Sequence, residues 1–587
     1  MTSQQALALA VFLAGASLAL WGLWRLIGPL RGGGVPWPRL EPLTLVPCAA
    51  LVAAGFFLRV ERLDTKTLCH PEIYVPGIPL PAGISEPPPR LGLRETLAWH
   101  FHDEPHPPGY YLLMWVWTKI FGWDVWTIRF PSVLFGTASI ALVWLLAAGA
   151  YGRAAAWTAA ALLCLNGHNI YWSQMARMYS MACFLGLVST WLWLRLRESE
   201  TRSGWREMAY IAVTLAAAAT EIYVWPLLAA QMLVTAAEPS PRSRRALALQ
   251  AVVLMLGASL WAHAVYRARP SPLGAPEWQF PRDYFGFGFL FRNDLDNFPV
   301  SSMPAWVLAV LAAAGVALLS AARNIPQRQA GNGGPLALRG FGSVALGGAL
   351  ITIATAILAF RRGPAMALVA LLPVMALLLP RALPFVCSLA PAGLRRLAGA
   401  SPVVILATVP PLLVFLLSFR VPLLADRLYL LFVPYLLTAI AGGLARLYRR
   451  PLPAIATVAF LGWAHFESAA YFRTAPTSLV DYQEAGKRLA AQLRPGDLVL
   501  VRRRDYLTTP FFYYLIGTPG AYVTEGSALD ARPRARVWVL ETDWNPVPAP
   551  LTERLTRYRQ QSEITAHHAR ARLFLTAPES PETPGFR

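Results

Sequence analysis

The stretch IRFPSVLFGTASIALVWLLAAG, residues 128–149, decides the class of fold. Arg129 is its only charged residue. The length of the stretch matches the roughly 20 apolar residues that an α-helix needs to cross a bilayer. Similar runs recur along the chain, which predicts a polytopic α-helical membrane protein of thirteen or fourteen helices. The candidate spans are 5–27, 42–60, 128–149, 154–171, 178–196, 207–220, 222–237, 246–266, 304–322, 342–360, 363–380, 402–420, 428–445 and 452–468.

The composition supports this class and argues against others. Of the 587 residues, 56% are hydrophobic and only 14% are charged, whereas a soluble domain carries about 25% charged residues. A soluble multi-domain enzyme, a coiled coil and a disordered chain are therefore disfavoured. The net charge of +20 would suit a nucleic-acid partner, but the arginines lie in small groups between apolar runs, as loops of membrane proteins do. We expect no nucleic acid as a partner, and we expect 5–27 to be a retained helix rather than a signal peptide.

The arginines also predict an orientation. If the loop after residue 60 lies outside the cytoplasm, about twenty arginines fall in the cytoplasmic loops. The short outside loops then hold few, in keeping with the positive-inside rule. Those few are Arg177, Arg361, Arg362, Arg420 and Arg427. The long loops 61–127 and 267–303 and the tail from 469 would share the outer, non-cytoplasmic side.

The tail differs in character from the rest of the chain. Residues 478–493 have the pattern of an amphipathic helix. After them, DLVLVRR, RVWVLETD and ARLFLTAP are typical of short strands, and TTPFFYYLIG is typical of a helix. Alternating helices and strands of this kind predict a small α/β unit. We therefore expect a transmembrane domain over 1–468 and a periplasmic α/β domain over 469–587.

The first outside loop carries the densest polar cluster of the chain. Asp103, Glu104 and His106 lie just before an aromatic run that begins at Pro108 and is too short to be a span. We expect that run to be a helix in the membrane interface, which would place the acids at headgroup height. With His100 and His102 nearby a divalent metal is possible, although a solvated polar turn explains the same residues and no cofactor is certain.

Three segments of this region carry a family resemblance. They are HDEPHPPGYYLLMWVWTKIFG (102–122), WTIRFPSVLFGTASIALVWLL (126–146) and YWSQMARMYSM (171–181). They resemble bacterial glycosyltransferase family 39, which includes protein O-mannosyltransferase-like proteins and relatives of the lipid A aminoarabinose transferases. A weaker resemblance falls on 426–444. The resemblance implies a GT-C fold and an enzyme that takes a sugar from a polyprenyl-phosphate donor.

The acidic motif of the family departs from its usual form here. Relatives read L-W-x-D-E, and this chain has Leu68-Cys69-His70-Pro71-Glu72. Pro71 therefore stands where relatives have the Asp that is expected to act as the base. Glu72 could take the proton of the acceptor, Asp103 or Glu104 could do so, or the activity could be altered or lost. Glu72 could also simply pair with an arginine. We expect Glu72 and then Asp103 as catalytic candidates.

Two arginines and one further acid complete the predicted site. Arg177 and Arg427 lie outside, within segments that resemble the family, where a guanidinium can bind the donor phosphate. Each could instead extend to a lipid headgroup. Glu221 falls in the outer turn of a helical hairpin, where an acid is costly unless it is paired or functional. It could hold an acceptor, a metal or Arg177.

Together these features predict a glycosyltransferase at the periplasmic face of a bacterial inner membrane. We expect the sugar transfer to invert the anomeric centre. Its partners would be the lipid-linked donor, membrane lipid and an acceptor that the sequence does not identify. A flippase of lipid-linked sugars is the first alternative, although a transporter would line a mid-membrane path with polar groups. A catalytically lapsed, lipid-binding homologue is the second, because of Pro71.

Overall fold

The computed structural model describes two stretches of the chain's helical part, within 42–267 and 401–447, and most of its tail. Described are residues 42–81, 89–102, 106–198, 203–236, 240–267, 401–418, 430–447, 480–500, 509–523 and 536–576 except 548, together with 462, 469 and 478. The predicted spans 5–27, 304–322, 342–360 and 363–380, all of 452–468 but residue 462, and the loop 268–303 lie outside them. So do Asp103, Glu104 and Arg427.

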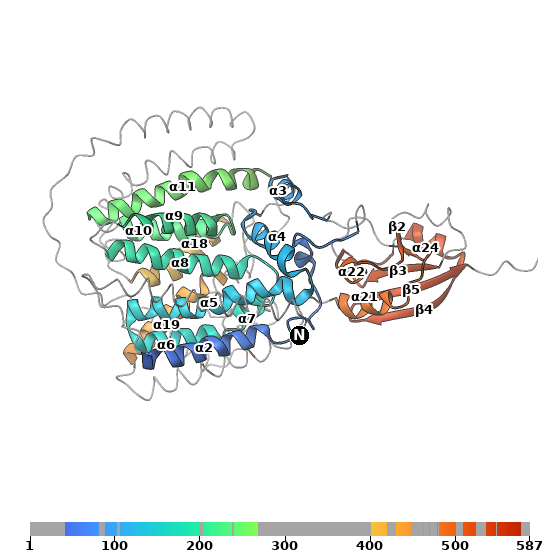
Figure 1. The fold of residues 1–587 in the computed structure, drawn as a ribbon, viewed down its shortest axis with the longest axis horizontal. Coiled ribbons are helices and arrows are strands. Elements are labelled where there is room, and N and C mark those ends of the chain that lie inside the picture. The colour runs from blue at the N-terminus through green and yellow to red at the C-terminus, as the bar shows by residue number, and fades with distance from the viewer. Residues whose placement is uncertain are drawn as a thin grey trace, which may run out of the picture.

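The part of the chain before the tail is helical wherever the structure describes regular elements. Its elements are α2 (Pro42–Val60), the 3-10 helix η1 (His70–Tyr74), α3 (Leu93–His102), α4 (Gly109–Phe121), α5 (Val125–Tyr151), α6 (Arg153–Leu165), α7 (Gly167–Ser173), α8 (Tyr179–Glu198), α9 (Gly204–Ala218), α10 (Val224–Ala236), α11 (Pro241–Arg267), α18 (Pro402–Leu417) and α19 (Val433–Leu447). The longer helices run side by side as a bundle (Figure 1). In the described residues, α5 and α8 are long and apolar enough to cross a membrane, and five shorter apolar helices accompany them.

Most described spans agree with their predicted ranges, and one is corrected. The prediction of a single span over 154–171 is wrong, because the helix ends at Leu165 and a short helix begins at Gly167. Asn166 causes the break, since its side chain accepts a hydrogen bond from the backbone nitrogen of Asn169 and so caps the new helix.

The helix α4 lies at the end of the bundle that faces the tail (Figure 1). Its buried side chains recur at helical spacing, with Tyr110, Tyr111 and Met114 turned to the core, whereas Val116 and Ile120 are exposed apolar residues. An amphipathic helix of this length suits the membrane interface, as the sequence predicts. The start of α4 packs closely against the turn after α9, where the nitrogen of Gly109 donates to the carbonyl of Ala219 at 2.8 Å. A side chain at position 109 would clash with that carbonyl.

The tail contains a five-stranded mixed sheet with helices. Its strands, in the order β2-β1-β3-β5-β4, are parallel from β2 to β3 and antiparallel from β3 to β4. The elements are α21 (Tyr482–Ala490), β1 (Leu498–Leu500), α22 (Thr509–Tyr514), β2 (Ala521–Val523), β3 (Val537–Thr542), α24 (Ala549–Leu555), β4 (Tyr558–Ala566) and β5 (Ala569–Thr576). We call these elements the sheet unit.

The sheet unit meets the bundle at the end where α3 and α4 lie (Figure 1), and its helix α22 packs against η1. Apolar side chains of α21 and α22 belong to the same continuous core as those of η1, α4 and α5. The described parts of the first outside loop and of the tail therefore share one end of the molecule.

Candidate active site

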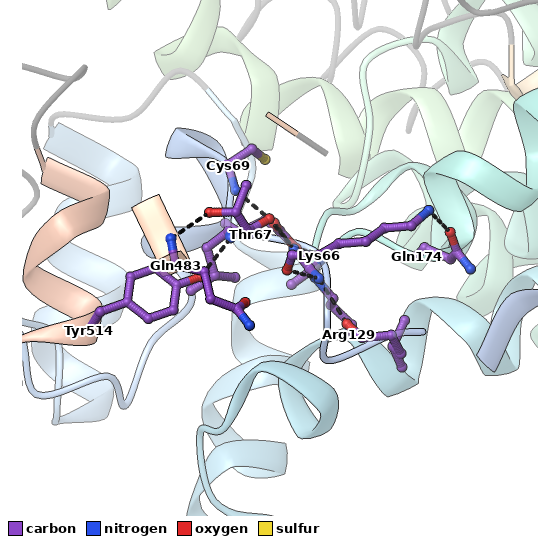
Figure 2. A network of polar contacts seen from close by, with 11 residues as sticks. Lys66, Thr67, Cys69, Arg129, Gln174, Gln483 and Tyr514 are labelled. Atoms are coloured by element: carbon purple, nitrogen blue, oxygen red, sulfur yellow. Dashed lines mark hydrogen bonds and ion pairs between the residues drawn. The ribbon is translucent and has the colours of Figure 1, made fainter. Parts of the chain in front are cut away.

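Arg129, in the first turns of α5, organises the polar residues at this end of the bundle. It is fully buried. Its guanidinium donates to the carbonyls of Leu63, Lys66 and Thr67 at 2.8 to 2.9 Å. Each of these bonds fixes a backbone position of the loop between α2 and η1 (Figure 2). The loop is thus held by a charged side chain from a helix about sixty positions later in the sequence.

Glu72 is the acid that balances Arg129. The two form a side-by-side pair, with Nε of Arg129 2.7 Å from Oε1 and Nη2 2.6 Å from Oε2. The backbone nitrogens of Ala176 and Cys69 donate to the same two oxygens. Burial alone would raise the pKa of Glu72, but the Arg129 charge and these hydrogen bonds outweigh burial and lower the pKa.

This geometry bears directly on the expected role of Glu72. Its side chain has no exposed surface, and both oxygens already accept two hydrogen bonds each. A carboxylate stabilised in this way holds a proton poorly and is out of reach of an acceptor. The arrangement is the arginine pair that the sequence left open as the other explanation of Glu72.

Arg177 lies in the turn between α7 and α8, at the same end of the bundle. Its Nη1 donates to the carbonyl of Pro71 at 3.1 Å and to the hydroxyl of Tyr111 at 2.9 Å. The side chain is buried, and its guanidinium also lies over the ring of Tyr179. Pro71, which stands where the resemblance predicts an Asp, therefore contributes a carbonyl that positions an arginine.

A second arginine reaches the same tyrosine from the first loop. The guanidinium of Arg90 lies 5.8 Å from the ring centre of Tyr111 and 5.4 Å from that of Trp99. His70 is close by, with its Nε2 2.9 Å from the hydroxyl of Tyr74. Burial and the charge of Arg177 lower the pKa of His70 to about 4, so the ring is neutral at pH 7. This region combines two guanidiniums, a neutral imidazole and aromatic faces, a setting suited to an anion.

The remaining predicted residues are only partly placed. Glu221 is buried in the turn between α9 and α10, and its Oε1 accepts from the nitrogen of Ile222 at 2.9 Å. That turn contacts the start of α4 through Ala219, so Glu221 lies at the same end of the bundle. His106 is half-buried just before α4. Within the described ranges no group of three or more His, Cys, Asp or Glu side chains could hold a metal ion.

Lys66 is a buried cation of this end that the sequence did not single out. Its Nζ donates to Oε1 of Gln174 at 2.6 Å (Figure 2). Burial, followed by the charges of Arg129 and Arg62, lowers its pKa to about 7. Arg129 was also missed as a site residue, although a lone arginine in an apolar span is itself a signal of function.

Comparison with known proteins supports the family resemblance. Residues 105–263 match the family described as dolichyl-phosphate-mannose-protein mannosyltransferase. The match confirms, over this segment, the resemblance drawn from the sequence. No curated protein is similar enough to the chain to count as a match.

Several solved structures show a distant likeness. ArnT from Cupriavidus metallidurans in the apo state is 16% identical with a TM-score of 0.39, over 91% of this chain and 99% of that one. The same protein bound to undecaprenyl phosphate is 15% identical with the same TM-score. The oligosaccharyltransferase AglB from Archaeoglobus fulgidus is 11% identical with a TM-score of 0.38, over 92% of this chain and 76% of that one.

Proposed function

We propose that this protein is a membrane glycosyltransferase of the GT-C type. It takes a sugar from a polyprenyl-phosphate donor and passes it to an acceptor at the periplasmic face of a bacterial inner membrane. Residues 1–468 form the membrane domain and 469–587 the periplasmic α/β domain. Support comes from the family match over 105–263 and from the two apolar helices within that segment.

The observation that carries the proposal is the placement of Arg177. A buried guanidinium, held by the Pro71 carbonyl and the Tyr111 hydroxyl, lies at the bundle end that also holds the interface helix α4. A donor phosphate at headgroup height would meet a positive charge there. As the sugar–phosphate bond breaks, negative charge grows on the phosphate, and a fixed guanidinium stabilises it. Arg427 is proposed for the same role.

For the base we propose Asp103 ahead of Glu72. The reason is chemical, because Glu72 is already fully engaged by Arg129 and two backbone nitrogens. Glu104, His106 and Glu221 are proposed to contact the acceptor or a divalent metal. Direct displacement by the activated hydroxyl inverts the anomeric centre.

The test is sugar transfer from undecaprenyl-phosphate-linked donors in proteoliposomes. Arg177→Ala is expected to raise the donor KM about 10-fold or more, the size of a lost charge-assisted hydrogen bond. Arg177→Lys should rescue little, since a lysine is a point charge without the planar fork. Arg153→Ala, at the exposed start of α6 at the other end of α5, is the matched control.

Three results would count against the proposal. Arg177→Ala with an unchanged donor KM removes the phosphate role. Movement of labelled donor across the bilayer without transfer indicates a flippase. Binding of undecaprenyl phosphate without either activity indicates a lapsed homologue.

A further inference from the structure

Four consecutive residues before η1 are each held by a hydrogen bond, and two of these bonds come from the sheet unit. The carbonyls of Lys66 and Thr67 accept from Arg129, and the nitrogen of Cys69 donates to Glu72. The hydroxyl of Thr67 accepts from the backbone nitrogen of Gln483 at 3.1 Å. The nitrogen of Leu68 donates to the hydroxyl of Tyr514 at 2.8 Å. Figure 2 shows these bonds converging on the segment 66–69.

The contact between the two parts is close and mostly buried. Tyr514 ends α22, and its pKa is raised to about 12 mainly by burial, so its hydroxyl stays neutral. Its neighbour Tyr513 donates to the carbonyl of Trp123, just before α5, at 3.1 Å, and the two rings meet edge to face. The sheet unit therefore contacts the bundle at two places, one before η1 and one before α5.

A short path leads from this contact to Arg177. The segment 66–69 runs directly into η1, whose Pro71 carbonyl holds Nη1 of Arg177. The same helix carries Glu72, which accepts from the nitrogen of Ala176, the residue before Arg177. A shift of 66–69 would thus reach Arg177 through two hydrogen bonds, one to its guanidinium and one to the backbone of the preceding residue.

We propose that Tyr514 is a positioning residue, through which the sheet unit fixes Arg177 for binding of the donor phosphate. The proposal rests on the proposed function for its ligand, but the coupling itself is a property of the fold. Tyr514 does not touch the ligand. It holds the backbone that holds Arg177.

The test combines hydrogen exchange with lipid binding on the purified full chain. In Tyr514→Phe the ring remains and the acceptor oxygen is lost, so backbone amides of 63–75 should exchange faster. Binding of undecaprenyl phosphate should weaken about 3- to 10-fold, the range that one neutral hydrogen bond carries. Thr67→Val, which removes the acceptor for Gln483, should act in the same direction. The two effects should be less than additive in the double variant, because both bonds hold one segment.

Tyr558→Phe is the matched control and should leave both measurements unchanged. Tyr558 lies on β4 and packs against a hydrophobic cluster of the sheet unit that is separate from the core shared with the bundle. Unchanged exchange in Tyr514→Phe and Thr67→Val would overturn the coupling. Faster exchange with unchanged lipid binding would overturn the positioning role and leave a contact that only joins the two parts. If the parent chain binds no undecaprenyl phosphate, the proposed function fails, and the exchange comparison alone decides the coupling.

Discussion

At the scale of single residues, the buried pair of Arg129 and Glu72 costs free energy of desolvation and fixes the loop before η1. Burying two charges is expensive, and the pair is favourable only when its remaining hydrogen-bonding groups are satisfied. Here the guanidinium also binds three carbonyls and the carboxylate two backbone nitrogens. The pair therefore fixes loop geometry, and the question is whether Glu72 also does chemistry.

Glu72→Gln separates these roles. The variant leaves Arg129 buried without its counter-charge, which costs about 3–5 kcal/mol, so its thermal unfolding midpoint in detergent should fall markedly. Adding Arg129→Gln removes the lone charge and should restore part of the midpoint. A Glu72→Gln protein that unfolds like the parent yet transfers sugar about 10²–10⁴-fold more slowly would instead identify Glu72 as the base.

Lys66 gives a pH dependence with a definite sign. Its pKa is lowered from 10.5 to about 7 in the folded protein. Between these values the unfolded chain holds a proton that the folded chain has released, so unfolding takes up a proton and stability rises with pH. The unfolding midpoint of the parent should rise more steeply from pH 7 to 9.5 than that of Lys66→Met. Lys487→Met, on the exposed face of α21, should keep the parent slope; equal slopes in all three would show that Lys66 is not buried as a shifted cation.

At the scale of elements, runs of apolar residues predict most of the described helices of the bundle. Even the two short candidates 207–220 and 222–237 correspond to helices, α9 and α10. The break at Asn166 was missed, since a polar cap inside an apolar run leaves the mean hydropathy almost unchanged.

The tail was predicted less completely, and the reason is exposure. The sequence indicates α21, β1, α22, β3 and β5, which carry buried side chains. It misses β4, most of whose residues are exposed, so that the alternation that marks a half-buried strand is weak. It also misses the short β2 and α24. Elements without a clear buried face leave little pattern to find.

The site shows the same limit at longer range. Arg177 could be found because the arginine bias predicts it to be one of the few outside arginines, and because its segment resembles the family. The hold of Arg129 on the loop could not, since the three groups that it binds there are backbone carbonyls 62 to 66 positions earlier. Every residue type has a backbone carbonyl oxygen, so no sequence pattern predicts which carbonyls a side chain will bind. Tyr514, 446 positions from Leu68, is beyond any local pattern for the same reason.

At the scale of the whole molecule, the polar loop, the amphipathic helix α4 and the sheet unit lie at one end of the bundle, as Figure 1 shows. The arginine bias predicts that this end is periplasmic, and that the loop before α9 is cytoplasmic. The direct contacts of Tyr514 and Gln483 with the first loop require those two segments to lie on one side of the membrane. Only the identity of that side depends on the arginines.

Labelling single introduced cysteines with an impermeant maleimide in intact spheroplasts decides the side. Glu553→Cys places a thiol on the exposed face of α24, in the sheet unit. Gly204→Cys places one at the start of α9, where an added Cβ meets nothing within 4 Å. We expect Glu553→Cys to label in intact spheroplasts and Gly204→Cys only after permeabilisation, with the parent chain as the blank for its native cysteines. The opposite pattern would reverse the molecule in the membrane and move the Arg177 site to the cytoplasmic face, where a periplasmic sugar transfer could not occur.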